Sequence, residues 1–125
     1  MITGDQILCH LVGDYLLQSH WMATEKTKQS FAAAVHAATY SLPFLFLTRF
    51  GPALAVIIGT HFLIDRFRLA RYVVWIKNGY WHLWKTPTTT GYRNDVPIWL
   101  STWLLIITDN TLHLICNGVA LGIPQ

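Results

Sequence analysis

At 125 residues the chain has room for a single domain, and its composition is unlike that of a soluble one. Apolar residues make up 53% of the sequence and charged residues 12%, which is about half the charged share that is usual in soluble domains. The formal net charge of +3 does not indicate nucleic-acid binding, because the basic residues gather in two segments between apolar runs, as in the cytoplasmic loops of membrane proteins. We therefore expect a small membrane protein with no nucleic-acid partner.

The first predicted helix covers about residues 2–19. Its apolar residues recur with the helical period, and its polar residues form a stripe on the opposite face, four positions apart: Gln6, His10, Asp14 and Gln18. Such an amphipathic helix could cross a bilayer or lie at its surface, so whether it spans stays open at this point. The polar stretch that follows, residues 20–30, predicts a loop or a short surface helix.

Three more helices are expected, at about residues 31–48, 53–76 and 96–121. The first of these is apolar except for His36, and Pro43 should kink it. The next begins after a Gly-Pro turn signal and emerges into water at its arginine-rich end. Glycine, proline and threonine residues predict irregular structure from 77 to 95, among aromatic residues typical of a membrane interface. The expected fold is therefore all-α, an integral membrane bundle of about four helices.

The basic residues also predict how such a bundle is oriented. Lys26 and Lys28 lie in the first loop, and most of the others lie at the end of the third helix and in the loop after it. If the first helix spans, both basic loops face the cytoplasm and both termini lie outside. The expected location is the inner membrane, with several passes through it.

Six polar residues within the apolar helices form three pairs. The pairs are His10 with Asp14, His61 with Asp65, and Asp109 with His113, while His36 stands alone on its helix. A spacing of four puts both members of a pair on one helix face, about 5–6 Å apart. A charged side chain near the bilayer centre costs at least about 2.5–3.5 kcal/mol on insertion scales, so some interaction must offset this cost.

Two kinds of interaction could do so: hydrogen bonding within the cluster, which would also suit a proton relay, or metal binding. Imidazole and carboxylate ligands suit zinc, manganese or iron, and helical bundles hold such ions with paired side chains on facing helices. Four histidines and three aspartates suffice for one or two divalent ions, and all seven are candidate ligands. Gln18 and Asn117, each one turn from a pair, and more weakly Tyr40, are candidates for hydrogen bonds that hold the ligands in place.

The basic run of Arg66, Arg68 and Arg71 directly follows the second His/Asp pair. It has two interpretations. The arginines could simply hold the cytoplasmic end of a helix in water, or they could form a lip that binds phosphate or lipid headgroups.

The motifs occur in a characteristic order along nearly the whole chain. They are His10-Leu-Val-Gly-Asp14-Tyr-Leu-Leu-Gln18, Trp21, Lys28, His36, His61-Phe-Leu-Ile-Asp65 and Asp109-Asn-Thr-Leu-His113. In this combination the chain resembles a family of small bacterial and phage integral membrane proteins of unknown function. More distantly, it is similar to a group of LexA-binding, inner-membrane-associated proteins regarded as metal-dependent hydrolases. The resemblance implies a membrane location and a metal site, but no particular reaction.

Three functions are compatible with these observations. The first is a metal-dependent hydrolase of a lipid-linked or phosphate-bearing substrate, in which metal activates water and Asp14, Asp65 or Asp109 acts as general base. The second is an ion transporter or relay component, whose four helices would need to form a homo-oligomer to leave room for alternating access. The third is a non-catalytic phage or bacterial factor that acts on a host membrane protein. In each case the lipid bilayer is an expected partner.

Overall fold

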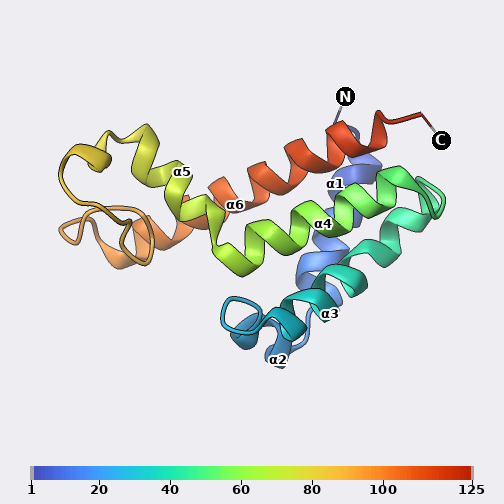
Figure 1. Ribbon diagram of the computed structural model, residues 1–125, viewed down its shortest axis with the longest axis horizontal. Helices are drawn as coiled ribbons and strands as arrows, with labels where there is room; N and C mark the ends of the chain where they lie inside the picture. Colours follow the sequence, from blue (N-terminus) through green and yellow to red (C-terminus); the bar gives the residue numbers. More distant parts are fainter. Residues whose placement is uncertain (1, 125) are drawn as a thin grey trace.

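The computed structural model describes residues 2–124, and the regular structure in this part of the chain is entirely helical (Figure 1). The α-helices are α1 (Gly4–Leu11), α2 (His20–Glu25), α3 (Ser30–Ser41), α4 (Pro52–Phe67), α5 (Leu69–Lys77) and α6 (Ile98–Leu121). A π-helical turn at Val12–Leu16 extends α1, and a 3-10 segment at Leu42–Phe46 extends α3. The expected all-α fold class is confirmed.

Four helices, α1, α3, α4 and α6, pack into a bundle. Figure 1 shows α4 and α6 running side by side in opposite directions, with α3 beside α4 and α1 behind them. The two ends of the chain lie at the same end of this bundle, and the short α2 lies near the start of α3 at the other. The four predicted segments are thus the four that enclose the interior, and α2 is the short surface helix.

Close contacts fix α1 against its neighbours. Its N-terminus is capped by the Thr3 side chain, which accepts a hydrogen bond from the Gln6 backbone nitrogen. The Gln6 side chain donates from Nε2 to the carbonyl oxygen of Leu114 at 2.7 Å, which ties α1 to α6. In the π turn, a Cβ on Gly13 would lie 2.5 Å from Tyr40 Cδ2, so the approach of this turn to α3 requires glycine.

The predicted third helix, residues 53–76, is not continuous. Helix α4 ends at Phe67, Arg68 adopts a left-handed backbone conformation with φ of 52°, and α5 begins at Leu69. A left-handed conformation costs a residue other than glycine roughly 1–2 kcal/mol. No glycine or proline marks the break, which is why the apolar periodicity alone predicted a single helix.

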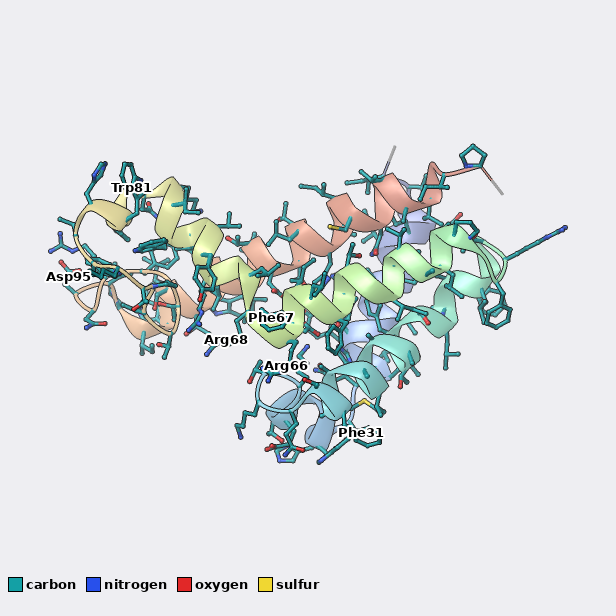
Figure 2. The ribbon with its side chains drawn as sticks, in the orientation of Figure 1. Phe31, Arg66, Phe67, Arg68, Trp81 and Asp95 are labelled. Atoms are coloured by element: carbon teal, nitrogen blue, oxygen red, sulfur yellow. The ribbon has the colours of Figure 1, made fainter. Side chains whose placement is uncertain are left out.

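The other long predicted segments differ from expectation mainly at their ends. Pro43, which was expected to kink the second helix, lies in the 3-10 segment that continues the chain after α3 ends at Ser41. Helix α6 begins at Ile98, two residues after the predicted start. Helix α5 and the connection of residues 78–97, which contains the labelled Trp81 and Asp95, extend beyond the bundle, and α5 packs against α6 (Figure 2).

The bundle buries a polar cluster beside an apolar core, and many large apolar side chains lie on its surface. The side chains of His36 and His113 are at most 1% exposed, whereas Phe46 is 92% and Phe50 is 84% exposed. Within residues 2–124, α6 is the one helix that is long and apolar enough to cross a membrane, and the apolar stretch Ser30–Phe46 is shorter. Helix length therefore supports one crossing and does not decide a multi-pass arrangement.

Candidate metal centre

The bundle brings six of the seven predicted ligands together in its interior. The π turn supplies Asp14, α3 supplies His36, α4 supplies His61 and Asp65, and α6 supplies Asp109 and His113. Five of them are buried, and Asp109 is partly exposed. Each pair lies on the inward face of its helix, because residues four apart share a face.

Four of these side chains direct one ligand atom each toward a common point. The atoms are Asp14 Oδ1, His36 Nε2, His61 Nε2 and Asp65 Oδ2. His36 Nε2 lies 2.9 Å from His61 Nε2, and the other distances from these two nitrogens to the two oxygens are 3.1–3.4 Å. A tetrahedral zinc site with bonds of about 2.0–2.1 Å places its ligand atoms roughly 3.3 Å apart, so this group has suitable dimensions.

Hydrogen bonding accounts for only part of this convergence. Four polar atoms lie within 3.3 Å of His36 Nε2, yet a ring nitrogen carries at most one proton and has one direction in which to bond. Asp65 Oδ2 lies 2.9–3.2 Å from three nitrogen atoms and forms no well-aligned hydrogen bond within residues 2–124. Lys26 neutralises part of the carboxylate charge, and the crowding of ring nitrogens and carboxylate oxygens around one position is the arrangement that an ion requires of its ligands.

A second group of candidate ligands adjoins the first through Asp65. Its other oxygen, Oδ1, lies 3.4 Å from His113 Nε2, and Asp109 Oδ2 lies 3.5 Å from the same nitrogen. The two oxygens of Asp65 therefore face different groups. Two-metal hydrolytic sites hold their ions about 3.5–4 Å apart, and a shared carboxylate is a natural bridge over that distance. The buried His/Asp groups could thus hold one or two ions.

The seventh predicted ligand, His10, lies beside the cluster but in neither group. Its Nδ1 lies 2.9 Å from the Tyr40 hydroxyl and 3.5 Å from Asp14 Oδ2, and its Nε2 lies 3.0 Å from Asn110 Oδ1. The Tyr40 hydroxyl already accepts a hydrogen bond from Asn117 Nδ2 at 2.6 Å. Tyr40 can then donate to His10 Nδ1, while His10 donates from Nε2 to Asn110. A ligand role for His10 stays a prediction, as does a supporting role for Asn117, which hydrogen-bonds Tyr40 and not a candidate ligand.

Tyr40 also orients a ligand directly. Its ring is stacked on that of His61, with centroids 3.6 Å apart and planes inclined by 18°. The Nδ1 atoms of His36 and His61 are buried and form no hydrogen bond within the described residues. The plane of the His61 ring is therefore set by packing against Tyr40.

Lys26 lies in the cluster, although the sequence pattern indicated only a basic loop. Its Nζ lies 2.9 Å from Asp65 Oδ2 and 3.3 Å from His36 Nε2, and its side chain is 17% exposed. Lys26 follows α2 directly, and the turn between α2 and α3 carries it to the end of α4. The only feature of the sequence that could have placed Lys26 in the cluster is its position between two helices that carry candidate ligands. The positive-inside pattern explains a lysine at that position equally well.

A cavity of about 220 Å³ opens onto the carboxylate side of the cluster. The three acidic residues that line it are Asp14, Asp65 and Asp109, and the three basic ones are Lys26, Arg68 and Arg71. Apolar side chains from α4, α5 and α6 also line it, together with Tyr15, Gln18, Thr27 and Asn110. The candidate metal ligands are thus accessible from a space that also presents cations.

Comparison with known proteins identifies one family. The family described as "Protein of unknown function (DUF3307)" matches residues 2–119. The chain belongs to the DUF3307 family. No curated protein and no solved structure matches it, so a similarity to the LexA-binding group is not shown.

Two of the three arginines predicted as a lip line the cavity of this DUF3307 protein. Arg66 points elsewhere: its Nη1 donates to the carbonyl oxygen of Thr27 and its Nε to Ser30 Oγ. Figure 2 shows Arg66 on the side of α4 nearest the turn between α2 and α3, and Arg68 at the junction with α5. Arg66 therefore holds the turn that carries Lys26.

Of the polar side chains that line the cavity of the DUF3307 protein, Arg68 has a hydrogen-bond partner, whereas Arg71 and Gln18 each have a buried atom without one in the described part of the chain. Arg68 donates from Nη2 to the carbonyl oxygen of Thr89 at 2.7 Å, and its partial burial and the charge of Arg71 lower its pKa. The Nε of Arg71 and the Oε1 of Gln18 are buried and form no hydrogen bond within residues 2–124. Gln18 therefore faces the cavity, and its predicted hydrogen bond to a ligand is not seen.

Proposed function

We propose that this DUF3307 protein is a membrane-embedded, metal-dependent hydrolase that acts on a lipid-linked or phosphate-bearing substrate. One observation carries the proposal: a single cavity is lined by the three carboxylates of the His/Asp cluster, by three basic side chains and by apolar side chains. A hydrolase of amphiphilic anions needs all three kinds of side chain in one cavity. The carboxylates hold the metal that activates water, the basic side chains bind the anion, and the apolar side chains contact the apolar part of the substrate.

The cluster residues have different exposure, which suggests different roles. A divalent ion bound there would polarise a phosphoryl or acyl oxygen and lower the pKa of a water molecule. Asp14 and Asp65 are buried and belong to the first group, with His36 and His61, so they would hold the ion. The side chain of Asp109 is 30% exposed and lines the cavity. If an ion fills only the first group, Asp109 is not a ligand, and it is then the carboxylate best placed to accept a proton from entering water.

The proposal includes a multi-pass position in the inner membrane with the basic loops in the cytoplasm. The many exposed apolar side chains support it, because lipid can cover apolar surface that water cannot, and the buried polar side chains contact one another inside the bundle. The length and hydropathy of α6 add support. Lys26 and the arginines at the α4–α5 junction would then place the mouth of the cavity on the cytoplasmic side.

Metal content tests the first part of the proposal. The protein would be purified in detergent without added metal, and its metal measured by mass spectrometry, for wild type, Asp65→Ala and the control Asp95→Ala, whose residue is exposed in the α5–α6 connection. We expect at least one ion per chain in wild type and control and a large loss in Asp65→Ala. Less than about 0.2 ion per chain in wild type, unchanged by Asp65→Ala, contradicts a metal centre.

Chemistry is tested by release of phosphate from lipid phosphates, with and without a chelator. We expect release by wild type that the chelator abolishes and zinc restores. Metal flux into liposomes that His61→Ala abolishes, without hydrolysis of any phosphate compound, would contradict the hydrolase and indicate transport instead.

A further inference from the structure

The net charge of the side chains that line the cavity indicates what charge a bound ligand should carry. Three acidic and three basic side chains line it, so these charges balance. Histidines that bind a metal are neutral, and one divalent ion would therefore leave an excess of about two positive charges. A phosphate monoester carries about −1.5 to −2 at neutral pH, whereas a diester carries one negative charge. The cavity of the loaded protein is thus complementary to a monoester.

The basic side chains are arranged to contact a phosphate held at the cluster. Lys26 Nζ is already within 2.9 Å of the candidate ligand atom Asp65 Oδ2. Arg71 offers a buried Nε with no hydrogen-bond partner in the described chain, and Arg68 uses Nη2 for Thr89 and keeps its other donors. Guanidinium groups with open donors bind phosphate oxygens in pairs, which a lone ammonium cannot do.

The backbone at Arg68 adds an independent observation. Its left-handed conformation is one that glycine adopts without cost, yet the position carries the long side chain that lines the cavity. Strained residues of this kind gather at ligand-binding sites, where the surrounding structure holds them in place. Here the break between α4 and α5 sets Arg68 and Arg71 on the cavity while Arg66 lies outside it.

The size and apolar wall of the cavity limit what the phosphate can be attached to. The volume of about 220 Å³ equals roughly seven water molecules at about 30 Å³ each, enough for a phosphate and a few carbon atoms. A glycerol backbone with two acyl chains exceeds this volume, so a single chain suits the cavity better. Ile64, Ala70, Leu105 and Ile106 line the space, and Ile106 is partly exposed, so a single chain could continue onto the surface of α6.

We propose that the cavity binds a phosphate monoester at the end of a single apolar chain, with Lys26, Arg68 and Arg71 as its phosphate subsite. The proposal rests on the proposed function for bond cleavage. In that reaction the oxygen of water bonds to phosphorus, the ester P–O bond breaks, and the chain leaves as an alcohol whose oxygen takes a proton, so that inorganic phosphate remains. Binding of the monoester does not depend on cleavage and can be measured separately.

Calorimetric titration of the zinc-loaded protein in detergent tests the subsite. The probes are octyl phosphate, its methyl diester and inorganic phosphate, the last of which distinguishes a free anion from a chain-linked one. We expect octyl phosphate to bind at least about tenfold more tightly than either of the others, a difference of about 1.4 kcal/mol. Equal affinity for the monoester and the diester, or for octyl phosphate and inorganic phosphate, would overturn the proposal.

Two substitutions test whether Arg68 and Arg71 are responsible for the tighter binding of octyl phosphate. Arg68→Gly removes the guanidinium while keeping a residue that tolerates the left-handed backbone, so it should fold, and Arg71→Gln provides a second loss of charge. We expect each to weaken octyl phosphate binding about tenfold or more. The controls Lys28→Gln and Arg49→Gln, exposed and outside the cavity, should bind as wild type does. Unchanged binding in both Arg68→Gly and Arg71→Gln would refute the subsite.

The two proposals fail in different ways. Selective binding of octyl phosphate that depends on Arg68 and Arg71, without any release of phosphate, supports the subsite and contradicts the hydrolase. Metal-dependent cleavage of the diester but not of the monoester supports the hydrolase and contradicts the subsite.

Discussion

The ammonium group of Lys26 lies 2.9 Å from Asp65 Oδ2, one of the four atoms that converge at the first candidate ion position. An ion at that position and the ammonium group would compete for the same oxygen. Metal binding therefore has to displace Lys26 toward the cavity, which its side chain already lines.

Removal of Lys26 should tighten metal binding. In Lys26→Gln the carboxylate of Asp65 has no resident cation to exchange, and the incoming ion meets one positive charge fewer in the cavity. We expect the dissociation constant for zinc to fall roughly tenfold, which corresponds to about 1.4 kcal/mol. Competition with a chromogenic chelator measures it, and Lys28→Gln, which loses only an exposed ion pair with Glu25, should leave it unchanged. Zinc affinity that is equal or weaker in Lys26→Gln would show that the two cations do not compete.

Asp65 and Asp109 should differ in how many ions they hold. Asp65 offers an oxygen to each group, whereas Asp109 contributes to the second alone. If wild type binds about two ions per chain, Asp109→Asn should retain about one and Asp65→Asn should lose most of both. Metal analysis after dialysis at fixed free zinc gives these numbers. Equal losses in the two variants would argue against Asp65 as the bridge.

Gly13→Ala should destabilise the bundle. The new methyl group would lie 2.5 Å from Tyr40 Cδ2 and 2.8 Å from the Tyr40 carbonyl oxygen, and the backbone atom cannot turn away. We expect a loss of about 1–3 kcal/mol in the free energy of unfolding, as for overpacked cores. Thermal unfolding in detergent measures it. The matched control is Gly59→Ala on α4, where nothing lies within 4 Å, and it should be neutral or stabilising by up to about 1 kcal/mol. Similar unfolding temperatures for both variants would contradict the close approach.

Tyr40→Phe should lower stability while leaving metal content intact. The substitution keeps the ring that stacks on His61, but it leaves Asn117 Nδ2 without its acceptor and His10 Nδ1 without its short contact. Buried polar groups that lose a partner cost about 1–3 kcal/mol each. Tyr80→Phe, in the α5–α6 connection, is the control. A metal content that falls together with stability would mean that the hydroxyl, and not only the ring, supports the ligands.

The i,i+4 spacing made most of the cluster predictable from the sequence. Two residues four apart face the same way on a helix, and a polar pair in an apolar helix must face the interior. His36 has no partner at that spacing, but as the one strongly polar residue of an apolar helix it was also expected to face the interior. Six of the seven residues predicted in this way lie in the two groups of candidate ligands.

Other members of the site could not be predicted from the pattern. Lys26 reaches Asp65 because of the path of the turn after α2, which periodicity does not encode. Arg68 and Arg71 line the cavity because of a left-handed break that no glycine marks. His10 matched the pair rule as well as the others did, yet a hydroxyl and an amide meet its ring nitrogens. Which polar partner a buried side chain meets depends on neighbours from other helices.

By itself, the sequence determined that the chain is helical and which helix faces are polar, because hydropathy and spacing act within one segment and need no partner. Only the tertiary structure decided that Asp65 turns one oxygen to each group, that Lys26 rather than Arg66 approaches it, and that a cavity joins the carboxylates to Arg68 and Arg71. These relations depend on how four helices pack and where one of them breaks. Distances of about 3 Å between atoms of different helices follow from that packing, and no periodicity along a single helix contains them.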